Sequence, residues 1–139
     1  GKKVALINFG TRLEECKKAS EKLLSKGISC TIIDARFAKP LDEKLIMEVA
    51  TNHEVLITIE EGSIGGFGSH VMQLLSDRGV FDTGLKFRSM TLPDIFIDQD
   101  TPEKMYENAG LDSLSIATKV EETLNSKIIL AKNKNKISN

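Results

Sequence analysis

The sequence contains few of the residues that most often carry chemistry in small proteins. Among its 139 residues there is no tryptophan, and there are one tyrosine, two histidines, two cysteines and three prolines. The net charge is −1, which gives no electrostatic footprint for nucleic acid or an anionic membrane surface. No apolar run approaches the roughly 20 residues that cross a bilayer. We therefore expect neither nucleic acid nor a membrane among the partners.

The cysteines and histidines do not form a recognisable site. Cys16 falls on an expected helix and Cys30 on an expected strand, and neither has a C-x-x-C partner. His53 and His70 do not complete a zinc-ligand spacing with them, and no serine or cysteine stands in a nucleophile-elbow context. We interpret both cysteines as buried thiols of a reducing compartment. The sequence thus predicts no metal site and no catalytic residue.

Strand patterns alternate with helix patterns along the chain. A chain of this length usually forms a single domain. Because Gly1-Lys2-Lys3 stands directly before a strand, we expect the chain to be a fragment of a longer protein. The alternation predicts a three-layer α/β/α domain over residues 1–125, with a mainly parallel sheet of four to five strands. The Lys- and Asn-rich tail, 126–139, is expected to be extended or disordered. Strands are expected over 4–9, 30–34, 55–59 and 86–92, in the order 2-1-3-4, the last at an edge.

Helix starts and stops are readable from local signals. Thr11 and Glu14 match a capping box, and that helix should run to about Lys26. A later helix should begin through Ser69 or Gly68. Asp82-Thr83-Gly84 is expected to be a turn. Further N-caps are expected at Asp42, at Thr101 before Pro102, and at Asp112 or Ser113.

The stretch from Glu54 to Met72 contains the most informative pattern. A buried strand ends at Glu60 and Glu61, and four glycines follow within seven residues. Adjacent strand residues point to opposite faces, so the two carboxylates are not predicted to share a substrate. We expect one to cap the glycine loop or meet a partner domain, and the other to be solvated. A phosphate at the helix start near Ser69 is an alternative to a structural turn, although the spacing matches no nucleotide motif.

A basic and aromatic loop follows the second expected strand. Arg36 and Lys39 flank Phe37, and Pro40 keeps the segment out of a helix. The basic pair could bind an anion or a neighbouring domain, or it could be solvated. An exposed aromatic residue favours the interface.

Four segments resemble one family. The sequence is similar to the C-terminal domain of transketolase-like thiamine diphosphate enzymes and, within them, to the 1-deoxy-D-xylulose-5-phosphate synthases. The resemblance covers about Lys3 to Leu124, and the tail departs from it. Its segments are VALINFGT at Val4–Thr11, DARFAKPLDEKLI at Asp34–Ile46, EEGSIGGFGSHV at Glu60–Val71, and LPDIFIDQDTPEKMYENAGLD at Leu92–Asp112. The first three also resemble 2-oxo acid dehydrogenase β subunits and transketolases, whereas the fourth is most similar to the synthases.

The resemblance implies a transferase that condenses pyruvate with glyceraldehyde 3-phosphate, at the start of isoprenoid biosynthesis and also feeding thiamine biosynthesis. It also implies a location in a bacterial cytoplasm, or in a plastid if the source is a plastid-bearing eukaryote. Its thiamine diphosphate and Mg²⁺ would be held by N-terminal and middle domains that precede this one, in a homodimer. No residue here corresponds to the family's catalytic residues, so the chain alone should be inactive. The alternatives are the corresponding domain of a transketolase or a 2-oxo acid dehydrogenase β subunit, and an anion-binding regulatory module. The interface or anion-binding candidates are Thr11, Arg36, Phe37, Glu61, Gly65, Gly66, Phe67 and Ser69.

Overall fold

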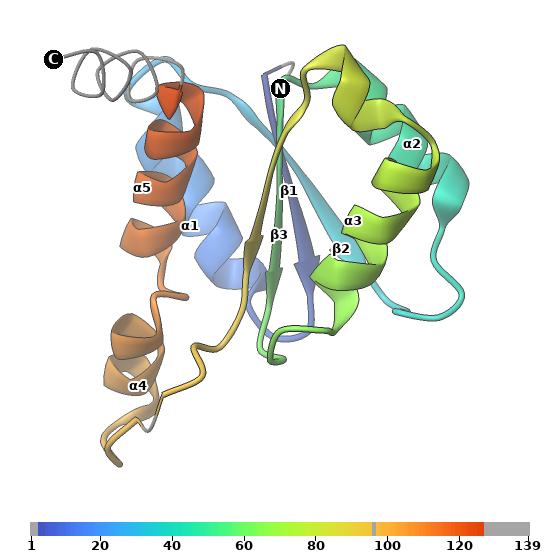
Figure 1. Ribbon diagram of the computed structural model, residues 1–139. Helices are drawn as coiled ribbons and strands as arrows, with labels where there is room; N and C mark the ends of the chain where they lie inside the picture. Colours follow the sequence, from blue (N-terminus) through green and yellow to red (C-terminus); the bar gives the residue numbers. More distant parts are fainter. Residues whose placement is uncertain (1–2, 96, 127–139) are drawn as a thin grey trace, which may run out of the picture.

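The sheet of the computed structural model has the predicted strand order. The structure describes residues 3–95 and 97–126. Four parallel strands lie in the order β2-β1-β3-β4, with α1 and α5 over one face and α2 and α3 over the other (Figure 1). The elements are β1 Val4–Phe9, α1 Leu13–Leu24, β2 Cys30–Ala35, α2 Glu43–Asn52, β3 Val55–Glu60, α3 Phe67–Asp77, a 3₁₀ helix Val80–Thr83, β4 Lys86–Met90, α4 Pro102–Ala109 and α5 Ser113–Leu124.

The two central strands are apolar on both faces because helices cover both. In β3 every residue from Val55 to Glu60 is buried. Alternate residues of β1 and β3 enter two separate cores, one under α1 and α5 and one under α2 and α3. β4 lies at an edge of the sheet, as predicted, and it ends at Met90 where the pattern suggested Leu92.

The predicted capping box at the start of α1 is wrong. The N-cap is Arg12, and it makes no side-chain cap. The Thr11 hydroxyl donates to Glu61 instead, and Glu14 pairs with Lys17 at 2.7 Å. A tertiary partner has taken the side chain that would have capped the helix. The helix also ends at Leu24, two residues before Lys26.

The start of α3 also differs from the prediction. Its N-cap is Gly66, and the Ser69 hydroxyl accepts a hydrogen bond from the backbone N–H of Gly65 at 3.0 Å. The expected turn at 82–84 is the end of the 3₁₀ helix, which closes on left-handed Gly84. The apolar patch around residue 96 lies partly, and the tail 127–139 wholly, outside the described residues. The N-caps Asp42, Thr101 and Asp112 are confirmed by hydrogen bonds from Leu45, Lys104 and Leu114.

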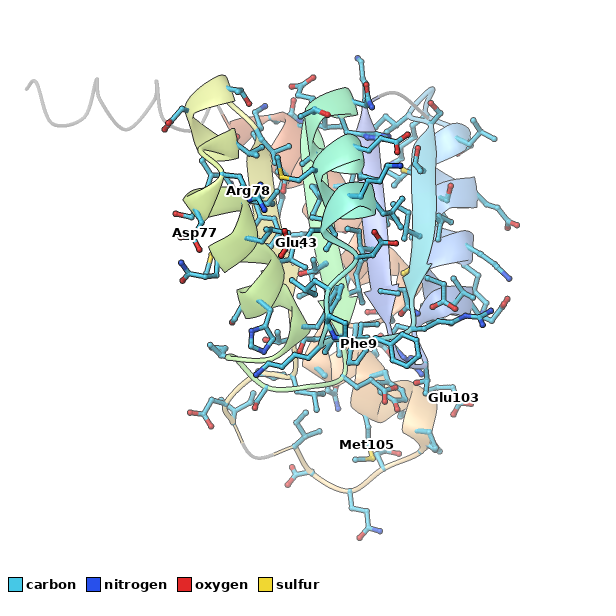
Figure 2. The ribbon with its side chains drawn as sticks, turned by 90° about the vertical axis from the view of Figure 1, so that its right-hand side faces the viewer. Phe9, Glu43, Asp77, Arg78, Glu103 and Met105 are labelled. Carbon is cyan, nitrogen blue, oxygen red and sulfur yellow. The ribbon has the colours of Figure 1, made fainter. Side chains whose placement is uncertain are left out.

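Neighbouring helices on each face of the sheet contact one another through side chains near their ends. Arg78 at the end of α3 lies 2.8 Å from Glu43 at the start of α2 (Figure 2). On the other face, Glu15 of α1 accepts a hydrogen bond from the backbone N–H of Ser113 at 2.8 Å. Its ion pair with Lys18 comes first among the causes that lower the pKa of Glu15. These contacts link neighbouring helices on each face of the sheet.

Candidate functional site

The carboxyl ends of the strands bring the predicted candidates to one edge of the molecule. The sequence order reverses between β1 and β3, which makes this the switch point of the sheet. The turn at Gly10 and Thr11 and the loop after β3 meet there, because the Thr11 hydroxyl donates to the Glu61 carboxylate. The two loops are therefore joined by a direct contact at the switch point.

Glu60 is buried within the loop that follows its own strand. Glu60 is only 2% exposed. Its carboxylate accepts hydrogen bonds from the backbone N–H groups of Phe67, at 3.1 Å, and Gly68. These are N–H groups of the first turn of α3, where a carboxylate is favoured by the helix dipole. The prediction that one glutamate caps the glycine loop is confirmed. A phosphate at this helix start would compete with the protein's own carboxylate.

The glycines of this loop are required for two different reasons. Gly65 has φ +102°, a conformation that side-chain-bearing residues avoid. Gly66 has an ordinary φ of −88°, but a Cβ there would lie 2.2 Å from Glu60 Oε1. At Gly68, a Cβ would lie 2.2 Å from the hydroxyl of Ser89. The glycine spacing therefore serves a close approach between backbone and a buried carboxylate.

Glu61 points to the other face of the sheet, as alternation requires. It accepts from Thr11, and its Oε1 lies 3.3 Å from Arg12 Nε. Burial opposes its ionisation, but hydrogen bonds from Thr11 and Tyr106 and the charge of Arg12 outweigh burial and lower the pKa of Glu61. The prediction that the second glutamate is solvated is wrong. Thr11, which is 50 residues away in the sequence, lies next to Glu61 in the folded chain and donates a hydrogen bond to it.

Arg12 connects this cluster to α4. Its guanidinium carbon lies 3.4 Å from the centre of the Tyr106 ring, and its side chain is only 14% exposed. A cation over an aromatic face is stabilised by the ring quadrupole, and more so when water is excluded. We define Thr11, Arg12, Glu61 and Tyr106 as the switch-point cluster. All its charges and hydroxyls face one another, which is the arrangement of a structural junction.

The sequence and the fold of this chain are similar to those of known proteins. Residues 1–116 match the family described as the transketolase C-terminal domain. The chain belongs to the transketolase C-terminal domain family. A solved structure titled "Split gene transketolase, inactive beta4 tetramer" is 28% identical to it, with a TM-score of 0.80 over 90% of this chain. The chain spans 40% of the length of that structure's chain. The parallel sheet with helices on both faces is the fold that the two share.

Two residues of this transketolase C-terminal domain join β1 to β2 at the same edge. Asn8 is fully buried, and its amide nitrogen donates to Asp34 at 2.7 Å and to the carbonyl of Gly10 at 3.0 Å. The amide fixes the turn that carries Thr11. Sequence patterns did not indicate a role for Asn8, Arg12 or Tyr106. A polar residue in an otherwise apolar strand was a usable signal for Asn8, whereas nothing local pairs Arg12 with Tyr106.

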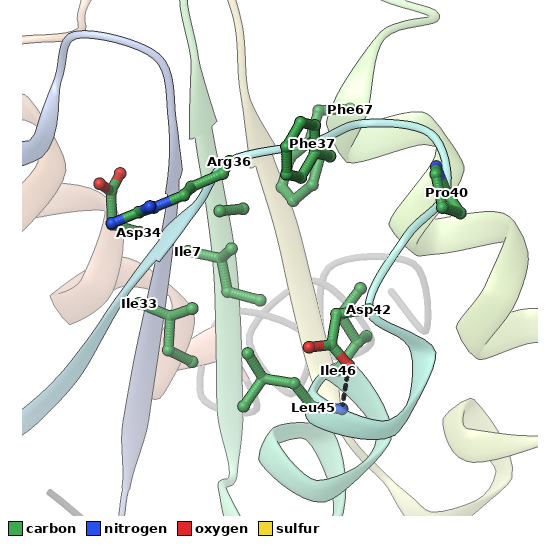
Figure 3. Close-up of a pocket in the computed structure, with 11 residues that line it drawn as sticks. Ile7, Ile33, Asp34, Arg36, Phe37, Pro40, Asp42, Leu45, Ile46 and Phe67 are labelled. Carbon is green, nitrogen blue, oxygen red and sulfur yellow. Dashed lines mark hydrogen bonds between the residues drawn. The ribbon is translucent and has the colours of Figure 1, made fainter.

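A cavity of about 250 Å³ lies beside β2 in this transketolase C-terminal domain, under the basic and aromatic loop (Figure 3). Its inner wall includes Phe67, which is 2% exposed and stacks on Phe9 with ring centres 4.9 Å apart. Phe37 is 71% exposed, as predicted, and Arg36 is directed towards Asp34. The cavity is lined mostly by apolar side chains and backbone, and one of its carboxylates, Asp42, already caps α2.

Within residues 3–95 and 97–126, no three His, Cys, Asp or Glu side chains gather closely enough to hold a metal ion. In the same part of the chain, no helix has the length and apolarity to cross a bilayer. Burial raises the pKa of Cys16 to about 12, so this thiol is not a ready nucleophile.

Proposed function

We propose that the chain is the contact-forming C-terminal domain of a thiamine diphosphate-dependent 1-deoxy-D-xylulose-5-phosphate synthase. The observation that carries this proposal is that, at the carboxyl edge of the sheet, charged side chains are paired within the chain while large apolar side chains are exposed. Glu60 and Glu61 accept hydrogen bonds from within the chain and Arg12 pairs with Glu61, while the large apolar side chains of Phe37, Ile64 and Ile95 are 71%, 80% and 67% exposed there. Such an edge is suited to contact with another protein surface.

Membership of the transketolase C-terminal domain family supports a transferase context. The narrower assignment to the synthase rests on the segment from Leu92 to Asp112, which resembles that group most. Pyruvate and glyceraldehyde 3-phosphate would then be the substrates of the assembled enzyme, and 1-deoxy-D-xylulose 5-phosphate and CO₂ its products.

The residues described do not fit a thiamine diphosphate and Mg²⁺ site. The N–H groups at the start of α3 are occupied by Glu60, and the second carboxylate of the loop, Glu61, is held by Thr11 and Arg12. We therefore assign the cofactor to the N-terminal and middle domains of the enzyme, which this chain would contact through Thr11, Arg36, Phe37, Glu61, Gly65 and Gly66. Phe67, at 2% exposure, would support that surface from within. Ser69 is committed to Gly65, so its role is within the loop.

The test is reconstitution. The chain is mixed with the protein that carries the two cofactor-bearing domains, and pyruvate and glyceraldehyde 3-phosphate are supplied. We expect product only when both proteins are present, and Phe37→Ser should weaken activity by weakening assembly. Leu24→Ser, at a residue 62% exposed on the far end of α1, is the matched control. Turnover by the chain alone, or none with its companion, would refute the proposal.

A transketolase is the second candidate, because the similar solved structure is titled a split-gene transketolase. The same reconstituted protein distinguishes the two. A synthase decarboxylates pyruvate, whereas a transketolase transfers a two-carbon unit between a ketose phosphate and an aldose phosphate and releases no CO₂. Measuring CO₂ release and ketose exchange side by side assigns the assembled enzyme to one reaction.

A further inference from the structure

A groove runs along α5, where this helix packs beside the end of α1. Its volume is about 660 Å³. One wall is a stripe of α5 residues at helical spacing, from Leu114 to Asn125, and the other wall is formed by Lys22, Ser25 and Lys26 of α1. Leu114 is 64% exposed at the start of α5. The groove therefore presents a large apolar side chain at one end.

The other end of the groove is the point where the last residues of the chain begin. Asn125 lines the groove directly after α5, and residues 127–139 follow it closely in sequence. The Lys86 ammonium donates to the carbonyl of Leu124 at 3.1 Å, which ties the end of α5 to the start of β4. Residues 127–139, the C-terminal segment, lie beyond the family match, which ends at residue 116. The shared family fold thus does not account for this segment.

The C-terminal segment has two kinds of side chain at every second position. Ile128 and Leu130 come first, and Lys132, Lys134 and Lys136 follow at the same spacing. In an extended chain, successive side chains point to opposite sides, so residues two apart share a side. An extended segment would therefore turn two apolar side chains, and then three cations, towards one surface.

The surface beside α5 offers partners in the same order. The groove with Leu114 comes first, and α4 lies beyond the start of α5 (Figure 1). Glu103 and Glu107 of α4 are exposed, and neither belongs to an ion pair within residues 3–95 and 97–126. Figure 2 shows Glu103 beyond the ends of the strands. An apolar groove is thus followed by carboxylates whose charge is not compensated within the described chain.

The lengths of the groove and of the segment agree. The α5 wall from Leu114 to Asn125 is about 16 Å long at the rise of an α-helix. An extended chain covers this length in about five residues, so a segment that turns back after α5 brings Leu130 close to Leu114. The lysines that follow then reach α4.

We propose that the C-terminal segment of this chain folds back along the groove between α1 and α5. Ile128 and Leu130 occupy the groove, and Lys132, Lys134 and Lys136 lie at the carboxylates of Glu103 and Glu107. Burial of the apolar side chains supplies the free energy of docking, and the complementary charges fix the direction of the segment. This inference does not depend on the reaction that the assembled enzyme catalyses.

The test is limited digestion of the 139-residue chain by trypsin, followed by mass spectrometry. Cleavage after Lys132 or Lys134 requires the segment to leave the surface, so its rate reports the undocked fraction. Leu114→Ser changes no cleavage site and should speed this cleavage by about tenfold or more, because docking then buries less apolar surface. Glu103→Gln with Glu107→Gln should speed it by about two- to fivefold.

The matched control makes the same kind of change on the opposite helical layer. Met72 of α3 is 46% exposed, and Met72→Ser should leave the cleavage rate within about twofold of wild type. Ile128→Ser with Leu130→Ser, which alters the segment and no lysine, should act like Leu114→Ser. Equal cleavage rates in wild type and in Leu114→Ser would overturn the proposal. Protection that increases with protein concentration would assign the groove to the segment of a second copy and would also overturn it.

A nitroxide spin label determines where the segment lies. The label is attached to Asn133→Cys in a Cys30→Ser background, at a position that faces away from the groove in the proposed arrangement. The amide signals of Thr118 and Glu107 should broaden severalfold more than that of Leu45, which lies on α2 in the opposite layer. Broadening confined to the end of α5 would contradict the proposed direction of the segment.

Discussion

Glu60 Oε1 lies 3.1 Å from the backbone nitrogen of Phe67, seven residues later in the chain. The strand end thereby caps the helix that follows it, and the glycines between them let the backbone wrap around the carboxylate. Glu60, a carboxylate at the end of a buried strand, thus holds the loop in place. Its burial at 2% exposure leaves no room for a substrate to reach it.

Replacing Glu60 should therefore affect folding strongly. Glu60→Ala leaves two buried N–H groups, those of Phe67 and Gly68, without an acceptor, at a cost of about 2–4 kcal/mol in the free energy of unfolding. Urea denaturation followed by circular dichroism measures it. Glu48→Ala, on the exposed side of α2, should change stability by less than about 0.5 kcal/mol. Equal effects at the two sites would contradict the capping role.

The clash at Gly66 can be separated from backbone strain at Gly65 by double mutants. Gly66→Ala places a Cβ 2.2 Å from Glu60 Oε1, so part of its cost should disappear when Glu60 is already alanine. We expect a coupling free energy of at least about 1 kcal/mol between these two changes. Gly65→Ala, which meets no atom within 4 Å but has φ +102°, should cost the same in both backgrounds. Chemical denaturation of the four variants and the two parents measures this, and additivity at Gly66 would show that the carboxylate is not the obstacle.

The sheet could be predicted from sequence because each of its determinants is local. The apolar runs at Val4–Phe9 and Val55–Ile59, the glycine stops and the N-caps Asp42 and Thr101 act within a few residues. Strand order then follows from the two-sided burial of β1 and β3 and the weaker pattern of β4. Local signals of this kind agree with the final fold, as expected of a sequence that folds to one structure.

The site could be predicted only in outline, because its contacts join residues far apart in the chain. Thr11 and Glu14 fit a capping box, yet Thr11 bonds to Glu61, 50 residues away. Arg12 follows the first strand and Tyr106 lies on α4, after the last strand, and no periodicity or spacing pairs them. Similarly, Ser69 is a good N-cap by type, but Glu60 already accepts from the first turn of α3. In each case a tertiary partner displaced a local one.

Tyr106 should control the order of α4. None of the residues of α4 is buried, so its attachment depends on the Tyr106 ring over Arg12 and on the buried Leu111 that follows. Tyr106→Ala should speed hydrogen exchange of the backbone amides of residues 103–109 in α4 by about tenfold or more, while α1 amides exchange as before. Tyr106→Phe keeps the ring and should have a smaller effect. Unchanged exchange in α4 after Tyr106→Ala would mean that another contact holds it.

The thiol of Cys16 should be inert in the native chain. It is fully buried, and burial raises its pKa to about 12, so only about one molecule in ten thousand carries the thiolate at pH 8. In a Cys30→Ser background, a disulfide reagent should modify Cys16 only as fast as the chain unfolds. Addition of denaturant should release one fast-reacting thiol per chain. Rapid modification of the folded protein would place Cys16 at an accessible site and contradict this packing.

Glu61 should make stability depend on pH in the acid range. Its pKa in the folded chain is lowered from 4.5, since hydrogen bonds from Thr11 and Tyr106 and the charge of Arg12 outweigh the opposing effect of burial. The ionised form is therefore favoured by folding. Its contribution is complete above the unfolded pKa and is lost as the pH falls through the folded pKa. Glu61→Gln should lower stability near pH 7 and flatten its decline below about pH 4.5, so that variant and wild type converge in acid.

Glu21→Gln, at an exposed position of α1, is the control and should follow the wild-type curve. Unfolding free energies measured from pH 3 to pH 7 decide this, and a Glu61→Gln curve parallel to wild type would show that the switch-point cluster does not favour the charged carboxylate.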